Sequence, residues 1–135
     1  MANWYGSARS NYVRVKDRER FMDWAQSLPE VEVVEQEGAF ALLATGEDGG
    51  WPSFRSRNDQ EDQDDEAIDL AAEISNHLAP GEVCILQQVG AEKLRYLSGL
   101  ALAVNAAGET LQISIDDIYT LVRERWNLSP SEAKY

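Results

Sequence analysis

The sequence has 135 residues, and its 24 acidic and 12 basic side chains give a formal net charge of −12. A chain of this length can bury a hydrophobic core, and its apolar content of 44% excludes wholesale disorder. The acidic balance also excludes direct binding to nucleic acid as the main function, because Lys and Arg contacts to phosphate supply most of that affinity.

The N-terminal part predicts a strand, a helix and a hairpin. Residues 11–16 alternate in the period-two manner of a half-buried strand. Asp17 is a favourable N-cap for a helix that Pro29 terminates, and the helix has an apolar stripe formed by Phe21, Trp24, Ala25 and Leu28. The runs 31–35 and 39–45 are separated by a short turn, so they predict a β-hairpin whose second strand is central.

The rest of the chain predicts a long loop, a helix, three strands and a last helix. Residues 46–63 are rich in Gly, Asp, Asn, Ser and Gln, as in a surface loop. The next segment is an amphipathic helix that ends before Pro80, with apolar positions at Ala67, Leu70, Ala71, Ile74 and Leu78. Three β-type runs follow at 83–89, 94–105 and 110–115, and a helix then carries Ile118, Leu121, Val122 and Trp126.

These elements predict an α+β fold. Their order is β-α-β-β-loop-α-β-β-β-α, and consecutive strands joined by short turns favour a mainly antiparallel sheet with helices packed on it. We expect a single domain over residues 1–135, with an acidic loop at about residues 46–64.

The compartment is predicted from the N-terminus and from the single cysteine. The N-terminus lacks the basic stretch and apolar run of a secretory signal, and no segment approaches about 18 consecutive apolar residues. Cys84 is the only cysteine and lies in an apolar run, where a buried structural thiol is expected. We therefore expect a cytoplasmic protein with no membrane partner.

The acidic excess belongs to the middle of the chain. Residues 30–92 carry sixteen acidic and two basic side chains, whereas the segment before them is slightly basic and the segment after them is neutral. Within this region, residues 59–69 supply seven carboxylates in eleven positions. The charge is therefore a local feature that could form a surface for a basic partner.

The acidic stretch leads into the second predicted helix. Several carboxylates are spaced three or four residues apart and would share one outward face, namely Asp62, Asp65 or Glu66, Asp69 and Glu73. Two interpretations stay open, a solvated helix N-terminus and a partner-binding acidic face. The candidate partner-binding residues are these acids, their neighbours and two loop aromatics: Asp59, Glu61, Asp62, Asp64, Asp65, Glu66, Asp69, Glu73, Trp51 and Phe54.

The available residue types disfavour metal binding and catalysis. Residues 59–69 lack the alternating acids, the central Gly and the terminal Glu of a calcium loop. His77 could share a face with Asp69 and Glu73, but a helix-end position beside the last carbonyls is the simpler interpretation. One His and one Cys make a nucleophile and base hard to assemble, and no phosphate-binding Gly-rich loop is present. We expect no metal, no cofactor, no catalytic residue and no enzymatic activity.

The predicted loop contains an aromatic pair. Trp51 and Phe54 flank Pro52 and form either a plug that packs on the sheet or an exposed anchor for a partner. Arg55 and Arg57 follow them and could pair with the acidic stretch, which would fold the loop back on itself.

Three segments carry a resemblance to known proteins: residues 3–12 (NWYGSARSNY), 49–53 (GGWPS) and 89–97 (VGAEKLRYL). Together they resemble a family of small acidic, mostly uncharacterised bacterial proteins of plasmids, phages and integrative elements. The resemblance spans nearly the whole chain and includes no catalytic motif. It implies a setting in which small acidic proteins antagonise host defence, including antirestriction and anti-CRISPR proteins, some of which mimic DNA.

We therefore expect a non-enzymatic acidic inhibitor or modulator of a host defence or nucleic-acid-binding protein, with an acidic face that mimics DNA. Its partner would be the basic surface of that protein, such as a Cas or restriction component. Two alternatives are an acidic immunity or accessory protein that binds through the Trp51 loop, and a small carboxylate-dependent enzyme. A homodimer is compatible with all three.

Overall fold

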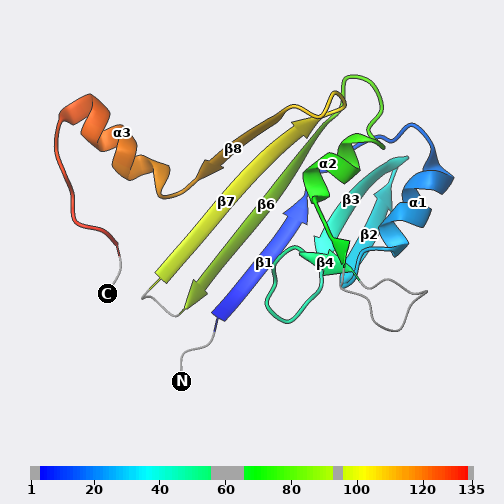
Figure 1. The fold of residues 1–135 in the computed structure, drawn as a ribbon, viewed down its shortest axis with the longest axis horizontal. Coiled ribbons are helices and arrows are strands. Elements are labelled where there is room, and N and C mark those ends of the chain that lie inside the picture. Colours follow the sequence, from blue (N-terminus) through cyan, green and yellow to red (C-terminus); the bar gives the residue numbers. More distant parts are fainter. Residues whose placement is uncertain (1–3, 56–65, 93–95, 134–135) are drawn as a thin grey trace.

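The computed structural model of the chain describes residues 4–55, 66–92 and 96–133 (Figure 1). Its strands are β1 (Trp4–Ser10), β2 (Val31–Gln36), β3 (Ala39–Ala44), β4 (Phe54–Arg55), β5 (Glu66–Ala67), β6 (Val83–Glu92), β7 (Tyr96–Asn105) and β8 (Thr110–Ser114). Its helices are α1 (Arg18–Gln26), α2 (Leu70–Ser75) and α3 (Asp117–Trp126).

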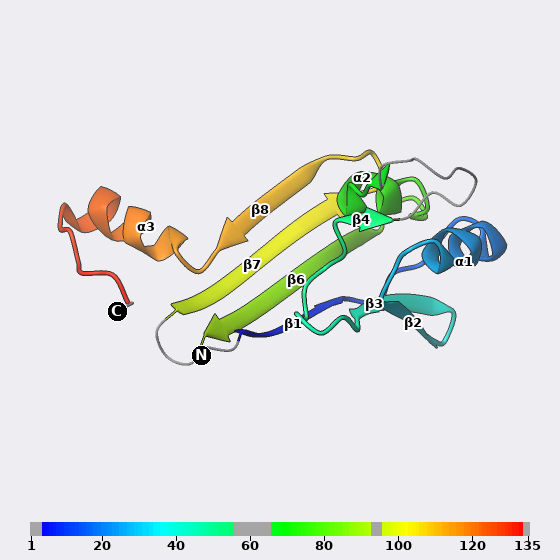
Figure 2. The same cartoon turned by 60° about the horizontal axis from the view of Figure 1, so that its bottom comes forward.

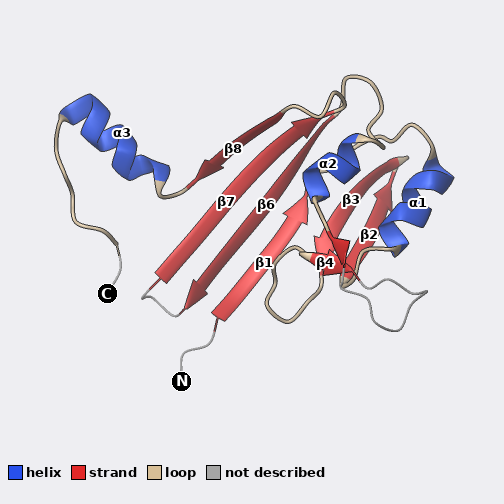
Figure 3. Ribbon diagram, viewed as in Figure 1, coloured by secondary structure: helices blue, strands red, loops and turns tan. Residues whose placement is uncertain are grey.

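Six strands form one antiparallel sheet in the order β2-β3-β1-β6-β7-β8 (Figure 3). β1 lies inside the sheet and pairs with both β3 and β6, while β6 and β7 form a long hairpin from Val83 opposite Asn105 to Glu92 opposite Tyr96. β4 and β5 pair with each other in a separate two-stranded sheet. The predicted α+β class with a mainly antiparallel sheet is confirmed.

α1 and α2 pack on one face of the six-stranded sheet, which we call the helix-bearing face (Figure 2). Phe21 of α1 and Ile74 of α2 are fully buried, and they pack in one cluster with strand residues that include Phe40, Leu42, Cys84, Leu86 and Val104. Each such side chain contributes roughly 1.5–3 kcal/mol when it is removed from water. The core therefore lies between these two helices and one face of the sheet.

The two core helices agree with the predicted helices to different degrees. α1 begins as predicted, because the Asp17 carboxylate accepts a hydrogen bond from the Arg20 N–H at 3.2 Å. α2 is shorter than predicted, because Asp69 caps it by accepting from the Ala72 N–H at 3.1 Å. The chain before Asp69 pairs with β4 instead, so Ala67 belongs to a strand and not to the helix.

The prediction of a strand at residues 11–16 is wrong, because this segment makes only isolated bridges. The first strand is β1, whose Gly6, Ala8 and Ser10 share the face of the sheet that carries the core. A side chain at Gly49 would overlap the carbonyl oxygen of Gly6, so the loop after β3 crosses directly over β1. This crossing requires small residues, which remove the apolar alternation that identifies a strand in a sequence.

Cys84 is buried in the core as expected, and burial raises the pKa of its thiol to about 12. Because only the thiolate is nucleophilic, we expect native Cys84 to react with a thiol-modifying disulfide reagent roughly 1,000-fold more slowly than in urea-unfolded protein. Absorbance of the released thiolate measures both rates. Similar rates in the two states would contradict this placement of the thiol.

Candidate interaction surfaces

Arg55 joins the loop to both core helices on the helix-bearing face. Its guanidinium forms an ion pair with the Glu73 carboxylate of α2 and donates a hydrogen bond to the Ser27 hydroxyl, at 2.6 Å, just after α1. The same carboxylate accepts a hydrogen bond from the Trp24 indole N–H at 2.8 Å. These four residues, Arg55, Glu73, Ser27 and Trp24, form a polar junction, which we call the Arg55 cluster.

The Arg55 cluster keeps Glu73 ionised. Burial acts to raise the pKa of this carboxyl, but the hydrogen bonds from Arg55 and Trp24, together with the Arg55 charge, outweigh burial and hold the pKa below its ordinary value of 4.5. Both partners come from other elements of the fold. Glu73 therefore holds the structure together and is not a free acid for a partner or a substrate.

The predicted acidic helical face is wrong for its described members. Glu66 lies in β5, with its carboxylate 3.8 Å from Arg55 Nε, while Asp69 caps α2 and Glu73 points into the Arg55 cluster. The expected pairing of Arg55 with the acidic stretch is confirmed at Glu66. The remaining candidates and Arg57 lie outside the described residues: Asp59, Glu61, Asp62, Asp64 and Asp65.

The two aromatic residues of the loop have different environments. Trp51 packs against the core beside Leu86 and Leu102, and its buried indole N–H has no hydrogen-bond partner among the described residues. Phe54 is 58% exposed. The plug interpretation therefore applies to Trp51, whereas Phe54 is the aromatic side chain that a partner could reach.

His77 packs against α1 just beyond the end of α2. Its ring stacks on Trp24, with ring centroids 5.0 Å apart, and meets Phe21 edge-on. Asp69 and Glu73 are used in the cap and the ion pair described above, so the three residues do not form a common site. Within residues 4–55, 66–92 and 96–133, no three metal-ligating side chains converge.

A second group of carboxylates lies at the β2 edge of the sheet and in its adjoining turns. Its exposed members include Glu30, Glu32, Glu37 and Glu47. Charged side chains on an edge strand disfavour pairing with another chain. Protection of the sheet edge is therefore enough to explain this group. The same acids can serve as a control when the acids of residues 59–65 are substituted.

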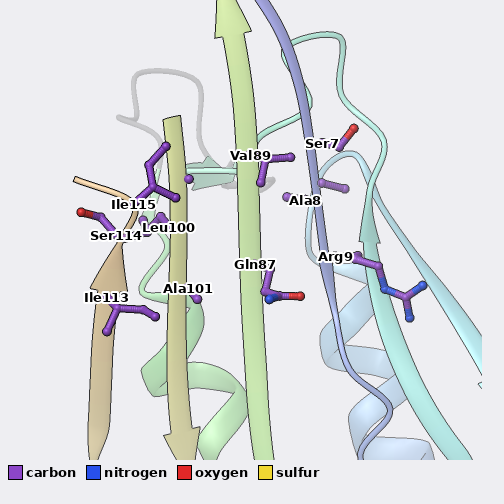
Figure 4. Close-up of a pocket in the computed structure, with 12 residues that line it drawn as sticks. Ser7, Ala8, Arg9, Gln87, Val89, Leu100, Ala101, Ile113, Ser114 and Ile115 are labelled. Carbon is purple, nitrogen blue, oxygen red and sulfur yellow. The ribbon is translucent and has the colours of Figure 1, made fainter. Parts of the chain in front are cut away.

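The face opposite α1 and α2, which we call the open face, holds an apolar groove of about 700 Å³ that the sequence reasoning missed (Figure 4). Strands β1, β6, β7 and β8 line this open-face groove, together with Ala44 at the end of β3. Figure 4 shows side chains from all four strands, including Arg9, Gln87, Val89, Ala101 and Ile113.

The orientation of β8 explains why the groove is apolar. Gln112 pairs with Leu102, whose side chain packs against the core, so the polar residues of β8 share the helix-bearing face. Leu111, Ile113 and Ile115 point the other way and are 78%, 65% and 52% exposed. β6 and β7 also carry apolar residues on both faces, a pattern typical of strands that are covered twice. From the sequence, this pattern could have predicted an apolar surface on the second face of the sheet.

No protein-family model, curated protein or solved structure matches this chain significantly. Among the residues that the structure describes, no helix is long and apolar enough to cross a membrane. The function must therefore be inferred from the surfaces of the chain itself.

We expect Arg55→Met to lower the free energy of unfolding in urea by roughly 1–3 kcal/mol, because it leaves the half-buried Glu73 carboxylate without its cation. The matched control is Arg18→Met, which breaks an exposed ion pair with Glu35 and should change stability little. Equal effects of the two substitutions would refute a stabilising role for the Arg55 cluster.

We also expect His77 to make stability fall as the pH decreases through 6.5. Burial, followed by the charges of Arg20 and Lys16, lowers its pKa below that ordinary value, although Asp17 and Glu73 act in the opposite direction. The unfolded chain then binds more protons, so the stability is complete above pH 6.5 and decreases below it. His77→Phe, which keeps a ring beside Trp24, should flatten the unfolding free energy in this range. Parallel pH profiles would contradict the prediction.

Proposed function

We propose that this chain is a non-enzymatic, cytoplasmic binding protein that inhibits or modulates a nucleic-acid-binding protein by occupying its basic surface. Antirestriction and anti-CRISPR proteins are examples of this class. The observation that carries the proposal is the local charge, sixteen acidic against two basic side chains in residues 30–92. A surface of this kind attracts a phosphate-binding groove at long range and competes with nucleic acid for it.

The described contacts add support, because among the described acids of this region only Glu35, Glu66 and Glu73 lie in ion pairs. Arg55, one of the two basic residues in the region, is already paired with Glu73 and is only 14% exposed. The acids of residues 59–65, which are outside the described residues, lie between Arg55 and Glu66 in the chain, and these two residues belong to the paired strands β4 and β5 on the helix-bearing face. The fold therefore anchors the two ends of the stretch beside α1 and α2.

A second candidate function uses an aromatic contact in place of charge. Phe54 is exposed and immediately precedes Arg55, so an accessory or immunity protein could bind its partner through Phe54. Salt separates the two candidates, because electrostatic attraction is screened at high ionic strength whereas apolar burial is not.

The test is capture of partners from a nuclease-treated bacterial lysate on immobilised protein, with elution by salt. The variant replaces four acids with Asn, namely Asp59, Asp62, Asp64 and Asp65. It leaves unchanged the α2 cap at Asp69 and the Arg55 partner Glu66. We expect it to bind a captured, purified nucleic-acid-binding protein about tenfold more weakly or worse, because each contact with a basic groove is lost.

The matched control neutralises four exposed acids at the β2 edge, Glu30, Glu32, Glu37 and Glu47→Gln, and changes the net charge equally. We expect it to retain most of the binding. Undiminished binding of the Asp variant would refute the proposal, and salt-resistant binding that Phe54→Ala abolishes would favour the aromatic candidate.

A further inference from the structure

Two apolar surfaces of the chain are uncovered in the described structure, and both involve its C-terminal third. The first is the open-face groove. The second is a stripe along α3 formed by Ile118, Leu121, Val122 and Trp126, of which Ile118 is 55% and Trp126 69% exposed. No residue of α3 is buried. Contiguous exposed apolar patches on a folded chain mark interaction surfaces.

The junction between β8 and α3 holds the helix away from its own groove. The Ile115 N–H donates to the Gly99 carbonyl at 3.0 Å, and the Ser114 N–H donates to the Asp117 carboxylate at 2.8 Å. The Ile115 side chain also lies over Gly99, where a Cβ would come within 2.8 Å of it. These contacts fix the direction in which α3 leaves the sheet, beyond the end of β8 (Figures 1 and 2).

The dimensions of the two surfaces match. α3 has ten residues and is therefore about 15 Å long. Apart from Ala44 at the end of β3, the groove lining comes from β8 with Ile115 just beyond it and from the neighbouring strands β1, β6 and β7, and these four strands extend about 14 Å from first to last at a spacing of about 4.8 Å. One copy of α3 can thus lie across these four strands.

The charges of the two surfaces are also compatible, which is unusual in a chain with a net charge of −12. The groove lining contains one cation, Arg9, and no carboxylate. α3 carries Asp117, Glu124, Arg123 and Arg125, so its charges balance. Two copies can therefore meet through these surfaces without bringing their acidic regions together.

We propose that a second copy of this chain covers the open-face groove, with α3 of each copy lying across strands β1, β6, β7 and β8 of the other. The arrangement is reciprocal, as in a two-fold symmetric dimer, because each copy supplies one helix and one groove. It buries the outward side chains of β8 and the apolar stripe of α3 in the same step. The proposal is independent of the acidic partner-binding surface.

The first test is disulfide trapping between two full-length chains that carry different tags. One chain has Ala101→Cys in the groove and the other has Leu121→Cys on α3, while the native Cys84 is buried and unreactive. Mild oxidation should link the two tags. Thr120→Cys, on the opposite side of α3, is the control and should give a severalfold lower yield.

No link between the tags would overturn the proposal. A chain with both substitutions tests the competing arrangement, in which α3 covers its own groove. A disulfide that forms only within one such chain would also overturn the proposal.

The second test is sedimentation equilibrium of the full-length protein. We expect a dimer, and we expect Ile113→Glu to raise its dissociation constant about 100-fold or more, because it places an unpaired charge in an apolar interface. Gln112→Glu adds the same charge to the opposite face of the same strand and should leave the dimer intact.

Ile113 is 65% exposed in the single chain, so the substituted chain should keep its fold, which circular dichroism verifies. Either a monomeric wild type over the whole concentration range or an equally tight Ile113→Glu dimer would refute the inference.

Discussion

The structure depends on burial of α1 and α2 against one face of an antiparallel sheet. Phe21 and Ile74 bring the two helices into a common core with the strands, and the loop after β3 is fixed to this core by Trp51. Arg55 then joins the loop to both helices through Ser27 and Glu73. The loop packs on the same side as the helices, so the opposite face of the sheet receives no cover from these elements.

The fold limits the electrostatic repulsion between its acidic side chains. Like charges in residues 30–92 destabilise a compact chain by mutual repulsion. Three described carboxylates in this region lie in ion pairs, Glu73 and Glu66 with Arg55 and Glu35 with Arg18. The lining of the open-face groove contains no carboxylate, so this apolar surface adds no acidic repulsion of its own.

The two proposals involve different sides of the sheet, because the described strands that flank the acidic stretch and the open-face groove lie on opposite faces. β4 and β5 anchor the ends of the acidic stretch on the helix-bearing face, whereas the groove lies on the open face. A dimer formed through the groove would direct both helix-bearing faces outward. Two acidic stretches in one particle could then engage two basic sites, and such bivalency raises the apparent affinity without any new contact.

Short-range patterns were sufficient for much of the fold. The Asp17 cap and the apolar stripe of α1, the β2–β3 hairpin and the three strands β6, β7 and β8 were all predicted, because each depends on residues close in sequence. β1 was missed, since its small residues are explained only by Gly49, which crosses it from a distant part of the chain. The length of α2 was overestimated because pairing of Ala67 with β4 competes with the helix.

The sequence alone determined the α+β class, the confinement of the acidic charge to residues 30–92 and the burial of Cys84, because composition and local periodicity encode these properties. Tertiary structure decided how Glu66 and Glu73 are used. Glu73 lies in an ion pair only because Arg55 and Trp24 approach it from other elements. Tertiary structure also decided which face of β8 is covered, since alternation distinguishes the two faces of a strand but does not indicate which one the helices cover.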